Sequence, residues 1–241
     1  MRLRLSHGRH RKRAVTRDAM LAILAEGAWF NRLSPSFRAA LLADGREMRF
    51  AAGAPVFWRG DAADGLYAVL DGAVEIGGVD AAGHAATLIH VQPGMWFGEI
   101  ALIDGMARTH DAIAVRETML LCVPRGPLFA GLDQRPGHWR ELAWLTTEKL
   151  RLSFRAAEAA SLLSAPQQVA TRLMMMVDGY GGTGARHTTL RLSQEQLAAM
   201  LSLSRQTVNR ILKALEQNGV IAVSHGRIDI VDLPSLRTIC E

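Results

Sequence analysis

The sequence has very little cysteine and no long apolar run. Cys122 and Cys240 are its only cysteines, too few to supply four thiolates to an iron–sulfur cluster. Cys122 lies in the apolar run Leu120–Val123, which predicts a buried, inert thiol. No apolar run approaches the roughly 18 residues of a membrane-spanning helix, and the basic N-terminus lacks the apolar stretch of a secretory signal. We therefore expect a cytoplasmic protein that has no membrane partner.

The usual groupings of catalytic and metal-binding residues are also missing. No Ser/His/Asp or Cys/His arrangement indicates nucleophilic catalysis. His84, His90 and His110 fall in a glycine-rich β-prone region, where they could suggest an enzymatic metal site of the cupin kind. The His-x-His pair of such sites is absent. We therefore expect neither a metal nor an enzymatic activity.

Positive charge, in contrast, is present in excess and is unevenly spread. The net charge of the 241 residues is +5, and hydrophobic residues make up 49% of the chain, enough for a packed core. Residues 1–17 carry seven Lys and Arg and no acid, and we expect a basic, flexible arm there. Such an arm either adds phosphate contacts or is a solvated tail.

Two short helices joined by a tight turn are predicted between residues 192 and 219. Ser193 is placed to cap the first helix, and Gln196 completes a capping box. Ser204 is placed to cap the second helix, which Asn218-Gly219 ends.

The second of these helices separates its apolar side chains from its polar ones. Its apolar residues recur at i, i+3, i+4 and i+7 and face a core: Val208, Ile211, Leu212 and Leu215. The opposite face carries donors for base edges and phosphates and no carboxylate: Arg205, Gln206, Asn209, Arg210 and Lys213. Arg191 and Ser193 are assigned to the same interface. The alternative is an ordinary helical hairpin with a solvated face, but the caps, the turn and the charge segregation agree on a DNA-binding helix-turn-helix.

The residues after these helices predict a β-hairpin. Val220–Val223 and Ile228–Val231 are short β-prone runs around Ser224–Arg227, which is typical of the wing of a winged helix. The segment resembles the DNA-binding domain of the Crp/Fnr family of bacterial transcription regulators, above all in residues 203–216. The resemblance implies base contacts by Arg205, Gln206 and Arg210. The family often has Glu where this chain has Gln206, and because Gln pairs with adenine, the preferred half-site can differ.

Residues 18–49 look helical, with a break at Ser34-Pro35. Between residues 50 and 124, glycines recur and separate short β-prone runs, which predicts an all-β sandwich or barrel. We expect residues 18–135 to form an effector-sensing barrel domain with flanking helices.

From about Pro136 to Leu163 the pattern is helical, and Ser164–Pro166 ends the helix and marks a hinge. Two sets of positions repeat every seven residues and predict a weak coiled-coil seam: Trp139, Thr146, Ser153 and Ala160, with Ala143, Leu150 and Ala157. We expect residues 136–163 to be a dimerisation helix and residues 164–241 a winged-helix DNA-binding domain. This α+β order of barrel or jelly roll, long helix and winged helix-turn-helix also resembles the Crp/Fnr regulators.

Residues 97–110 resemble the phosphate-binding cassette of cyclic-nucleotide domains. Gly98 allows close backbone approach, and a short helix beginning at Glu99 would direct N–H groups at an anion. The resemblance implies that Arg108 and Thr109 hold a cyclic phosphate and that Glu99 accepts from a ribose hydroxyl. Further candidates for the effector site are Gly98, Ile100, Ser153 and Phe154.

Two residues depart from this pattern by adding bulk. His110 follows the hydroxyl residue where a small residue is usual, and Phe154 replaces a small polar residue. Phe154 is therefore predicted to fill the space that a purine would enter, while Arg108 pairs with Glu99 or Asp111 if the cassette is a structural relic. Three alternatives remain open: a cyclic nucleotide, another small effector, or none.

The sequence as a whole predicts a homodimeric regulator of the Crp/Fnr type that binds a palindromic operator in double-stranded DNA. The resemblance implies RNA polymerase as a protein partner. The alternatives are a constitutive DNA-binding protein with a vestigial pocket, and a cupin-like barrel enzyme with a DNA-binding tail.

Overall fold

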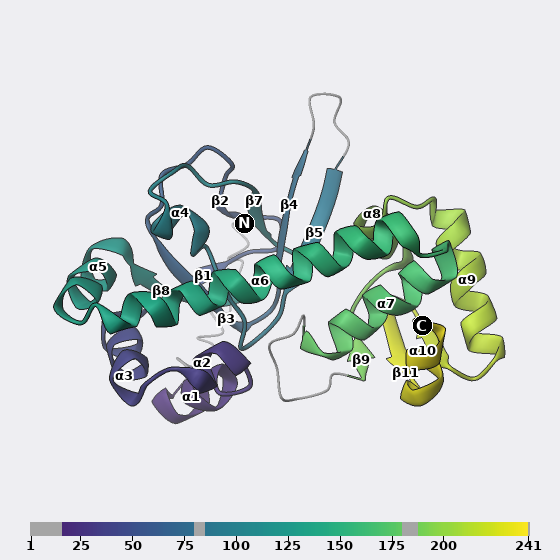
Figure 1. Ribbon diagram of the computed structural model, residues 1–241, viewed down its shortest axis with the longest axis horizontal. Helices are drawn as coiled ribbons and strands as arrows, with labels where there is room; N and C mark the ends of the chain where they lie inside the picture. Colours follow the sequence, from purple (N-terminus) through teal and green to yellow (C-terminus); the bar gives the residue numbers. More distant parts are fainter. Residues whose placement is uncertain (1–15, 80–84, 180–187, 241) are drawn as a thin grey trace, which may run out of the picture.

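The computed structural model describes residues 16–79, 85–179 and 188–240, which form two lobes joined along one long helix (Figure 1). Residues 1–15 of the predicted basic arm lie outside the described residues. Up to the end of β8, the described part of the first lobe contains four helices and eight strands: α1 (Arg17–Leu24), α2 (Ala28–Arg32), α3 (Pro35–Asp44), β1 (Arg46–Phe50), β2 (Pro55–Phe57), β3 (Gly65–Asp71), β4 (Val74–Val79), β5 (Ala85–Val91), β6 (Trp96–Phe97), α4 (Ile100–Ile103), β7 (Asp111–Ala114) and β8 (Thr118–Pro124).

These strands form two antiparallel sheets that face each other. One has the order β1-β8-β3-β6 and the other β2-β7-β4-β5. In the central strand β3, Tyr67 and Val69 point between the two sheets. The alternate residues Leu66, Ala68 and Leu70 pack against the flanking helices. Because a strand alternates its side chains between two faces, a strand buried on both faces needs a continuous apolar sequence.

The same alternation explains the environment of the predicted buried cysteine. Cys122 on β8 is 7% exposed and points between the sheets. Burial raises the pKa of its thiol, and Asp64 adds to the effect, so the thiolate is disfavoured. This agrees with the inert thiol predicted from its apolar neighbours.

The N-terminal helices cover the first sheet and hold the start of the long helix α6 (Gly137–Leu162). Ser34 caps α3 and also donates through its N–H and Oγ to the Glu141 carboxylate, at 2.6 and 2.9 Å. Trp29 donates its indole N–H to the Glu141 carbonyl at 2.7 Å. The helical prediction for residues 18–49 was wrong at its end, because Arg46–Phe50 form β1, which pairs with β8.

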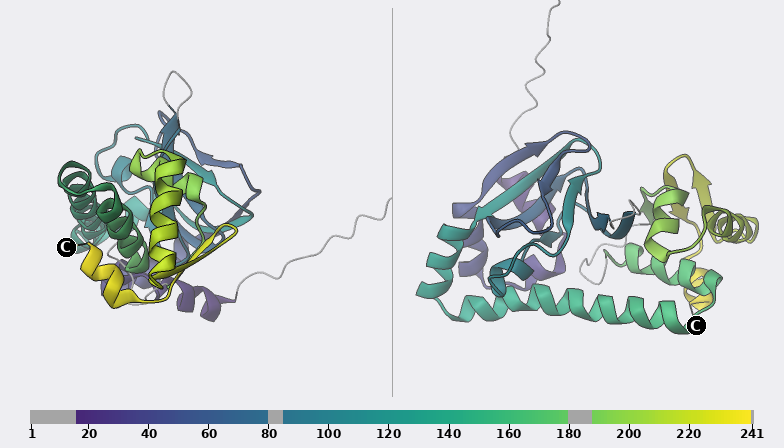
Figure 2. Two further views of the ribbon diagram at one scale, coloured as in Figure 1. Left: turned by 90° about the vertical axis from the view of Figure 1, so that its right-hand side faces the viewer. Right: turned by 90° about the horizontal axis from the view of Figure 1, so that it is seen from above.

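Helix α5 (Arg125–Gln134) leads into α6, which runs along both lobes (Figures 1 and 2). Its first half buries His138, Leu142 and Leu145 against the barrel. The predicted break follows it, since Ser164 and Gln167 form a capping box at the start of α7 (Ala165–Val177).

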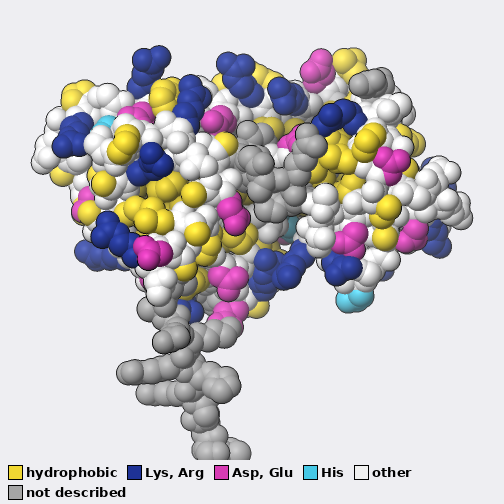
Figure 3. Space-filling view, turned by 90° about the horizontal axis from the view of Figure 1, so that it is seen from below, with side chains coloured by type: hydrophobic (Ala, Val, Ile, Leu, Met, Phe, Trp, Pro, Cys, Tyr) yellow, Lys and Arg dark blue, Asp and Glu magenta, His cyan; other side chains and the backbone are white. Residues whose placement is uncertain are grey.

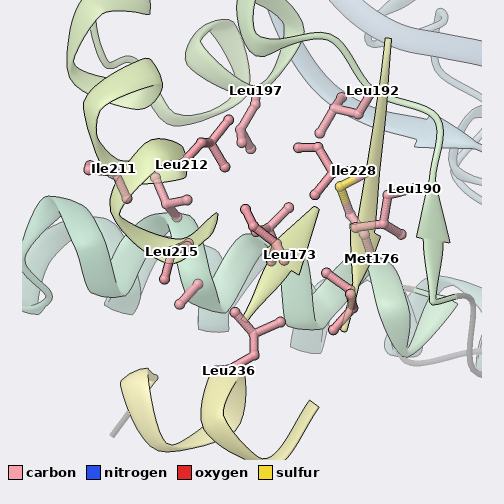
Figure 4. Close-up of a cluster of buried hydrophobic side chains, with 14 of the residues drawn as sticks. Leu173, Met176, Leu190, Leu192, Leu197, Ile211, Leu212, Leu215, Ile228 and Leu236 are labelled. Carbon is pink, nitrogen blue, oxygen red and sulfur yellow. The ribbon is translucent and has the colours of Figure 1, made fainter. Parts of the chain in front are cut away.

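The second lobe is built around one apolar core. Its elements after α7 are β9 (Thr189–Leu190), α8 (Gln194–Leu201), α9 (Arg205–Gln217), β10 (Ile221–Ser224), β11 (Arg227–Ile230) and α10 (Leu233–Ile239). Leu173 of α7, Leu197 of α8 and Leu212 of α9 point toward one another in its interior (Figure 4). The strands have the order β10-β11-β9, so the predicted hairpin gains a third strand from residues before α8. The α+β prediction of a barrel followed by a winged helix-turn-helix is confirmed.

The two lobes touch beside α6. Helix α8 packs on strand β5, and Ile89, Met95 and Leu152 pack against the core of the second lobe. Arg172 of α7 donates to the carbonyl of Leu88 on β5 and to that of Met200 on α8, both at 3.2 Å. The barrel is therefore connected to the helix-turn-helix by direct contact as well as by the hinge.

Candidate functional site

The turn between α8 and α9 has the sharp geometry of a helix-turn-helix. Ser193 accepts from the Gln196 N–H at 3.1 Å, and Ser204 accepts from the Thr207 N–H at 3.0 Å, so both predicted caps are present. Ser202 between the helices has φ 52°, the left-handed conformation that lets the chain reverse within a few residues.

Helix α9 lies at the outer edge of its lobe (Figures 1 and 2), and it presents a basic face to solvent. The four predicted apolar residues of this helix are buried in the core. Arg205, Gln206, Arg210 and Lys213 are exposed. The acid of this helix closest to them in sequence, Glu216, is engaged elsewhere, because its carboxylate accepts from the Val223 N–H of the wing at 2.8 Å.

Charges of both signs occur on the face of the molecule seen from below (Figure 3). On the face in Figure 3, Lys and Arg side chains are interspersed with Asp and Glu on both lobes. From Arg205 to Lys213, helix α9 exposes three cations and no carboxylate. Such a face fits the acceptor-rich major groove and the phosphates that border it.

Three residues predicted at this interface have other surroundings. The Asn209 amide donates to Gln194 at 2.7 Å and so connects α9 to α8. Ser193 is occupied as a cap. Arg191 is exposed, and its charge lowers the pKa of Arg116 in the barrel, where burial is the larger cause; Arg191 therefore lies near the junction of the lobes.

The barrel contains a cavity of about 360 Å³ beside α6, within the range of small-molecule sites. Its lining includes the cassette residues Gly98, Glu99, Ile100, Arg108 and Thr109, together with Ser153 of α6. The structure thus brings together six of the seven predicted effector residues. The seventh, Phe154, does not line the cavity of its own chain and is 66% exposed. That it fills the space of a purine concerns a contact across a dimer and stays a prediction.

Arg108 is buried and directed toward the barrel strands. Its guanidinium donates to Asp64 at 2.7 Å and to the carbonyls of Gly65 and Gly98 at 2.9 and 2.6 Å. It also lies over the Phe57 ring, at 4.2 Å from the centroid. The prediction that Arg108 pairs with Glu99 or Asp111 was wrong, because Asp64 is the acid that pairs with it.

Gly98 makes this position of Arg108 sterically accessible. Its φ is 90°, a conformation that favours glycine, and a Cβ at this residue would lie 2.9 Å from Arg108 Nη1. The short helix α4 begins one residue after Glu99, so Glu99 is its N-cap residue rather than its first helical residue.

Glu99 is 1% exposed and pairs with a lysine that the sequence reasoning missed. Lys149 of α6 donates to Glu99 Oε2 at 2.6 Å. The other oxygen, Oε1, is buried without a hydrogen-bond partner, and such an atom is costly unless a ligand or water satisfies it. A buried carboxylate requires a cation nearby, but nothing in the local sequence indicates that it comes from a residue 50 positions later.

The remaining polar groups of the cavity are weakly engaged. Ser153 Oγ donates to the Lys149 carbonyl at 3.0 Å, and Thr109 Oγ1 lies 3.0 Å from His110 Nδ1. Burial, with a smaller contribution from Arg59, lowers the pKa of His110. His110 is therefore neutral near pH 7 and does not add a charge to the cavity.

The predicted seam positions on α6 differ in exposure along the helix. Trp139 and Thr146 are half-buried against their own barrel. Leu150 and Phe154 are 50% and 66% exposed, and with Ala157 they continue along the outer face of the helix.

Among residues 16–79, 85–179 and 188–240, no helix is long and apolar enough to cross a membrane. The same residues contain no group of three or more His, Cys, Asp and Glu side chains suited to a metal ion.

Comparison with known proteins matches both lobes. Residues 47–135 match the model of the cyclic nucleotide-binding domain, and residues 167–239 match that of the Crp-like helix-turn-helix domain. The chain is 29% identical to the cyclic AMP receptor protein of Thermus thermophilus over 87% of its own length and 95% of that relative's. It is also 29% identical to a CRP-like cAMP-activated global transcriptional regulator of Mycobacterium tuberculosis, with the same coverage.

Solved structures show the same arrangement. A CRP/FNR-family transcriptional regulator from Thermus thermophilus is 27% identical and has a TM-score of 0.63, covering 81% of this chain and 98% of that one. FixK2 from Bradyrhizobium japonicum shares the fold with a TM-score of 0.73 at 22% identity, covering 82% of this chain and 98% of that one.

Proposed function

The chain belongs to the CRP/FNR family of transcription regulators, and on that basis we propose that it binds a palindromic DNA operator as a homodimer under the control of a small effector in the barrel cavity. Its relatives are transcription regulators, so the protein is a regulator and not an enzyme. The barrel-enzyme alternative is therefore set aside. We also propose a cytoplasmic location and RNA polymerase as a protein partner.

The observation that carries this proposal is the exposed basic face of α9. The side chains of Arg205 and Arg210 are exposed to solvent, and Glu216 of the same helix bonds to the wing instead of to them. An arginine recognises guanine through two hydrogen bonds. We assign Gln206 to the neighbouring base pair and Lys213 to a phosphate. Asn209 supports this face from behind through Gln194.

A dimer is supported by the apolar stripe on α6. Leu150 and Phe154 are large apolar side chains that remain exposed in the single chain, and a second copy of α6 would cover them. Two copies of α9 related by a two-fold axis would then read an inverted repeat with half-sites about one helical turn apart.

Selection of binding sites from random DNA tests the proposal. We expect an enriched inverted repeat. Arg210→Ala should weaken binding by about 1–3 kcal/mol, or roughly 5- to 150-fold, and relax the preference at one position. Arg237→Ala removes an exposed arginine of α10 in the same lobe and is the matched control, with no expected effect. A selected site without two-fold symmetry, or full specificity in Arg210→Ala, contradicts the proposal.

Arg108 pairs with Asp64, and Glu99 pairs with Lys149. These two internal ion pairs favour one alternative, a constitutive DNA-binding protein whose barrel serves dimerisation alone. In that case the DNA affinity would be unchanged by every small molecule tested. A change in DNA affinity on adding a ligand that binds the cavity would exclude this alternative.

A further inference from the structure

The cavity is lined by three cationic side chains, and two of these are paired with acids. Arg108 pairs with Asp64 at 2.7 Å, and Lys149 pairs with Glu99 at 2.6 Å. The third cation is Arg172, which enters the cavity lining from α7 of the other lobe. No carboxylate in the described part of the chain forms an ion pair with Arg172.

Arg172 is instead held by two uncharged acceptors. Its Nη1 donates to the Leu88 carbonyl of β5 and its Nη2 to the Met200 carbonyl of α8, both at 3.2 Å. Hydrogen bonds of a guanidinium to a carboxylate or phosphate are shorter and stronger than these. An anion that reaches Arg172 therefore has an advantage over both carbonyls.

The walls of the cavity are mainly apolar. They include Phe57, Ile76, Val91, Phe97, Leu152 and Met175. Contact with such walls favours a ligand whose body is hydrocarbon or aromatic. A ligand with more hydroxyl groups than Glu99, Thr109 and Ser153 can pair would leave the others without partners there.

We propose that the cavity binds an apolar molecule with a single acidic group, and that this group pairs with Arg172 rather than with Arg108. The inference rests on the proposed function, because it names the chemical class of the effector. Arg108 remains in its ion pair with Asp64, and Lys149 remains with Glu99, so the ligand needs to displace neither of the two internal pairs.

This pairing also gives the ligand a direct effect on the DNA-binding lobe. Arg172 connects the cavity, strand β5 and helix α8, and α8 packs on β5 at the junction of the lobes. When the acid draws Arg172 away from Leu88 and Met200, the junction loses two hydrogen bonds. The ligand therefore loosens α8 from the barrel and frees the lobe to turn about the hinge.

Binding of decanoate and 1-decanol to the full-length protein, measured by calorimetry, tests the ligand class. The two probes have the same ten-carbon chain and differ in charge. We expect decanoate to bind more tightly by about tenfold or more, because a hydrogen-bonded charge pair is worth roughly that factor. Arg172→Gln should remove this difference while 1-decanol binding is unchanged, and Arg172→Lys should retain part of it. Arg140→Gln, which removes an exposed arginine at the start of α6, is the charge-matched control and should behave as the wild type.

Other results would overturn the inference. Failure of decanoate to bind the wild type, or equal binding by wild type and Arg172→Gln, refutes the assignment of the acid to Arg172. Tight binding of cAMP that is lost in Arg108→Ala and retained in Arg172→Gln refutes it as well, yet leaves the proposed effector-controlled regulator intact. Selection of an asymmetric DNA site would instead refute the proposed function and leave the decanoate result standing.

Hydrogen exchange of the same protein tests the coupling. Decanoate should raise the exchange rate of backbone amides in residues 198–203, at the end of α8. Unchanged exchange at saturating decanoate refutes the release of α8.

Discussion

The apolar stripe on α6 gives the sharpest quantitative prediction for the dimer. Leu150 and Phe154 are 50% and 66% exposed in the single chain. Full burial of a Leu or Phe side chain contributes about 1.5–3 kcal/mol. Covering the exposed part of each would therefore contribute about 0.8–1.5 kcal/mol for Leu150 and about 1–2 kcal/mol for Phe154.

Each side chain occurs twice in a symmetric dimer. If both are fully covered, their joint contribution is about 3.5–7 kcal/mol. The double variant Leu150→Ala/Phe154→Ala should thus raise the dimer dissociation constant by at least about 300-fold. The monomer should remain folded, because these side chains are not part of either lobe's core.

Sedimentation equilibrium measures this constant, with circular dichroism to confirm the fold. Trp58→Ala is the matched control, since Trp58 is also 50% exposed and apolar but lies on the barrel after β2. It should leave the constant unchanged. An unaltered dimer in the double variant, or equal dissociation in Trp58→Ala, would refute the assignment of the interface to α6.

Two further predictions concern the barrel. Asp64→Asn removes the charge that pairs with Arg108. The proposed effector leaves this pair intact, but calorimetry should show that weak binding of cAMP becomes about three- to tenfold tighter than in the wild type, a modest factor because Asp64 is 60% exposed. An unchanged cAMP affinity argues against the Asp64 pair as a restraint on Arg108. The hydrogen bond from His90 lowers the pKa of Glu75 below its usual 4.5, so this carboxylate stabilises the folded state above pH 4.5 and the contribution is lost as the pH falls through the lowered pKa. Glu75→Gln should therefore lower the thermal midpoint at pH 7, with the deficit shrinking in acid; a deficit independent of pH would contradict this reasoning.

Local sequence patterns were sufficient to predict the helix-turn-helix and the hairpin of the second lobe. The caps Ser193 and Ser204, the apolar spacing in α9 and the hairpin after Gly219 all depend on residues a few positions apart, and each is present in the structure. Cassette residues 98–109 could be placed together for the same reason, because they are consecutive along the chain. In contrast, Arg46–Arg49 of β1 were assigned to a helix, since the strand is paired with β8, 68 to 76 positions later.

What the sequence did not supply is the partner of each buried charge. A buried ion needs a counter-ion, but Coulomb attraction depends on distance in space and not on spacing in the chain. Arg108 is equally compatible by sequence with Glu99, Asp111 and Asp64, and the packing of β3 against the cassette decides among them. Lys149 was missed as the counter-ion of Glu99 because it reaches this carboxylate from α6. The rotation of α6 depends on how Trp139 and Leu142 pack against the barrel. That same rotation moves Phe154 out of the cavity and onto the exposed face. One packing choice at the start of α6 thus determines both the counter-ion of Glu99 and the side chains that a second subunit would meet, so the ligand site and the dimer seam are not independent features of this chain.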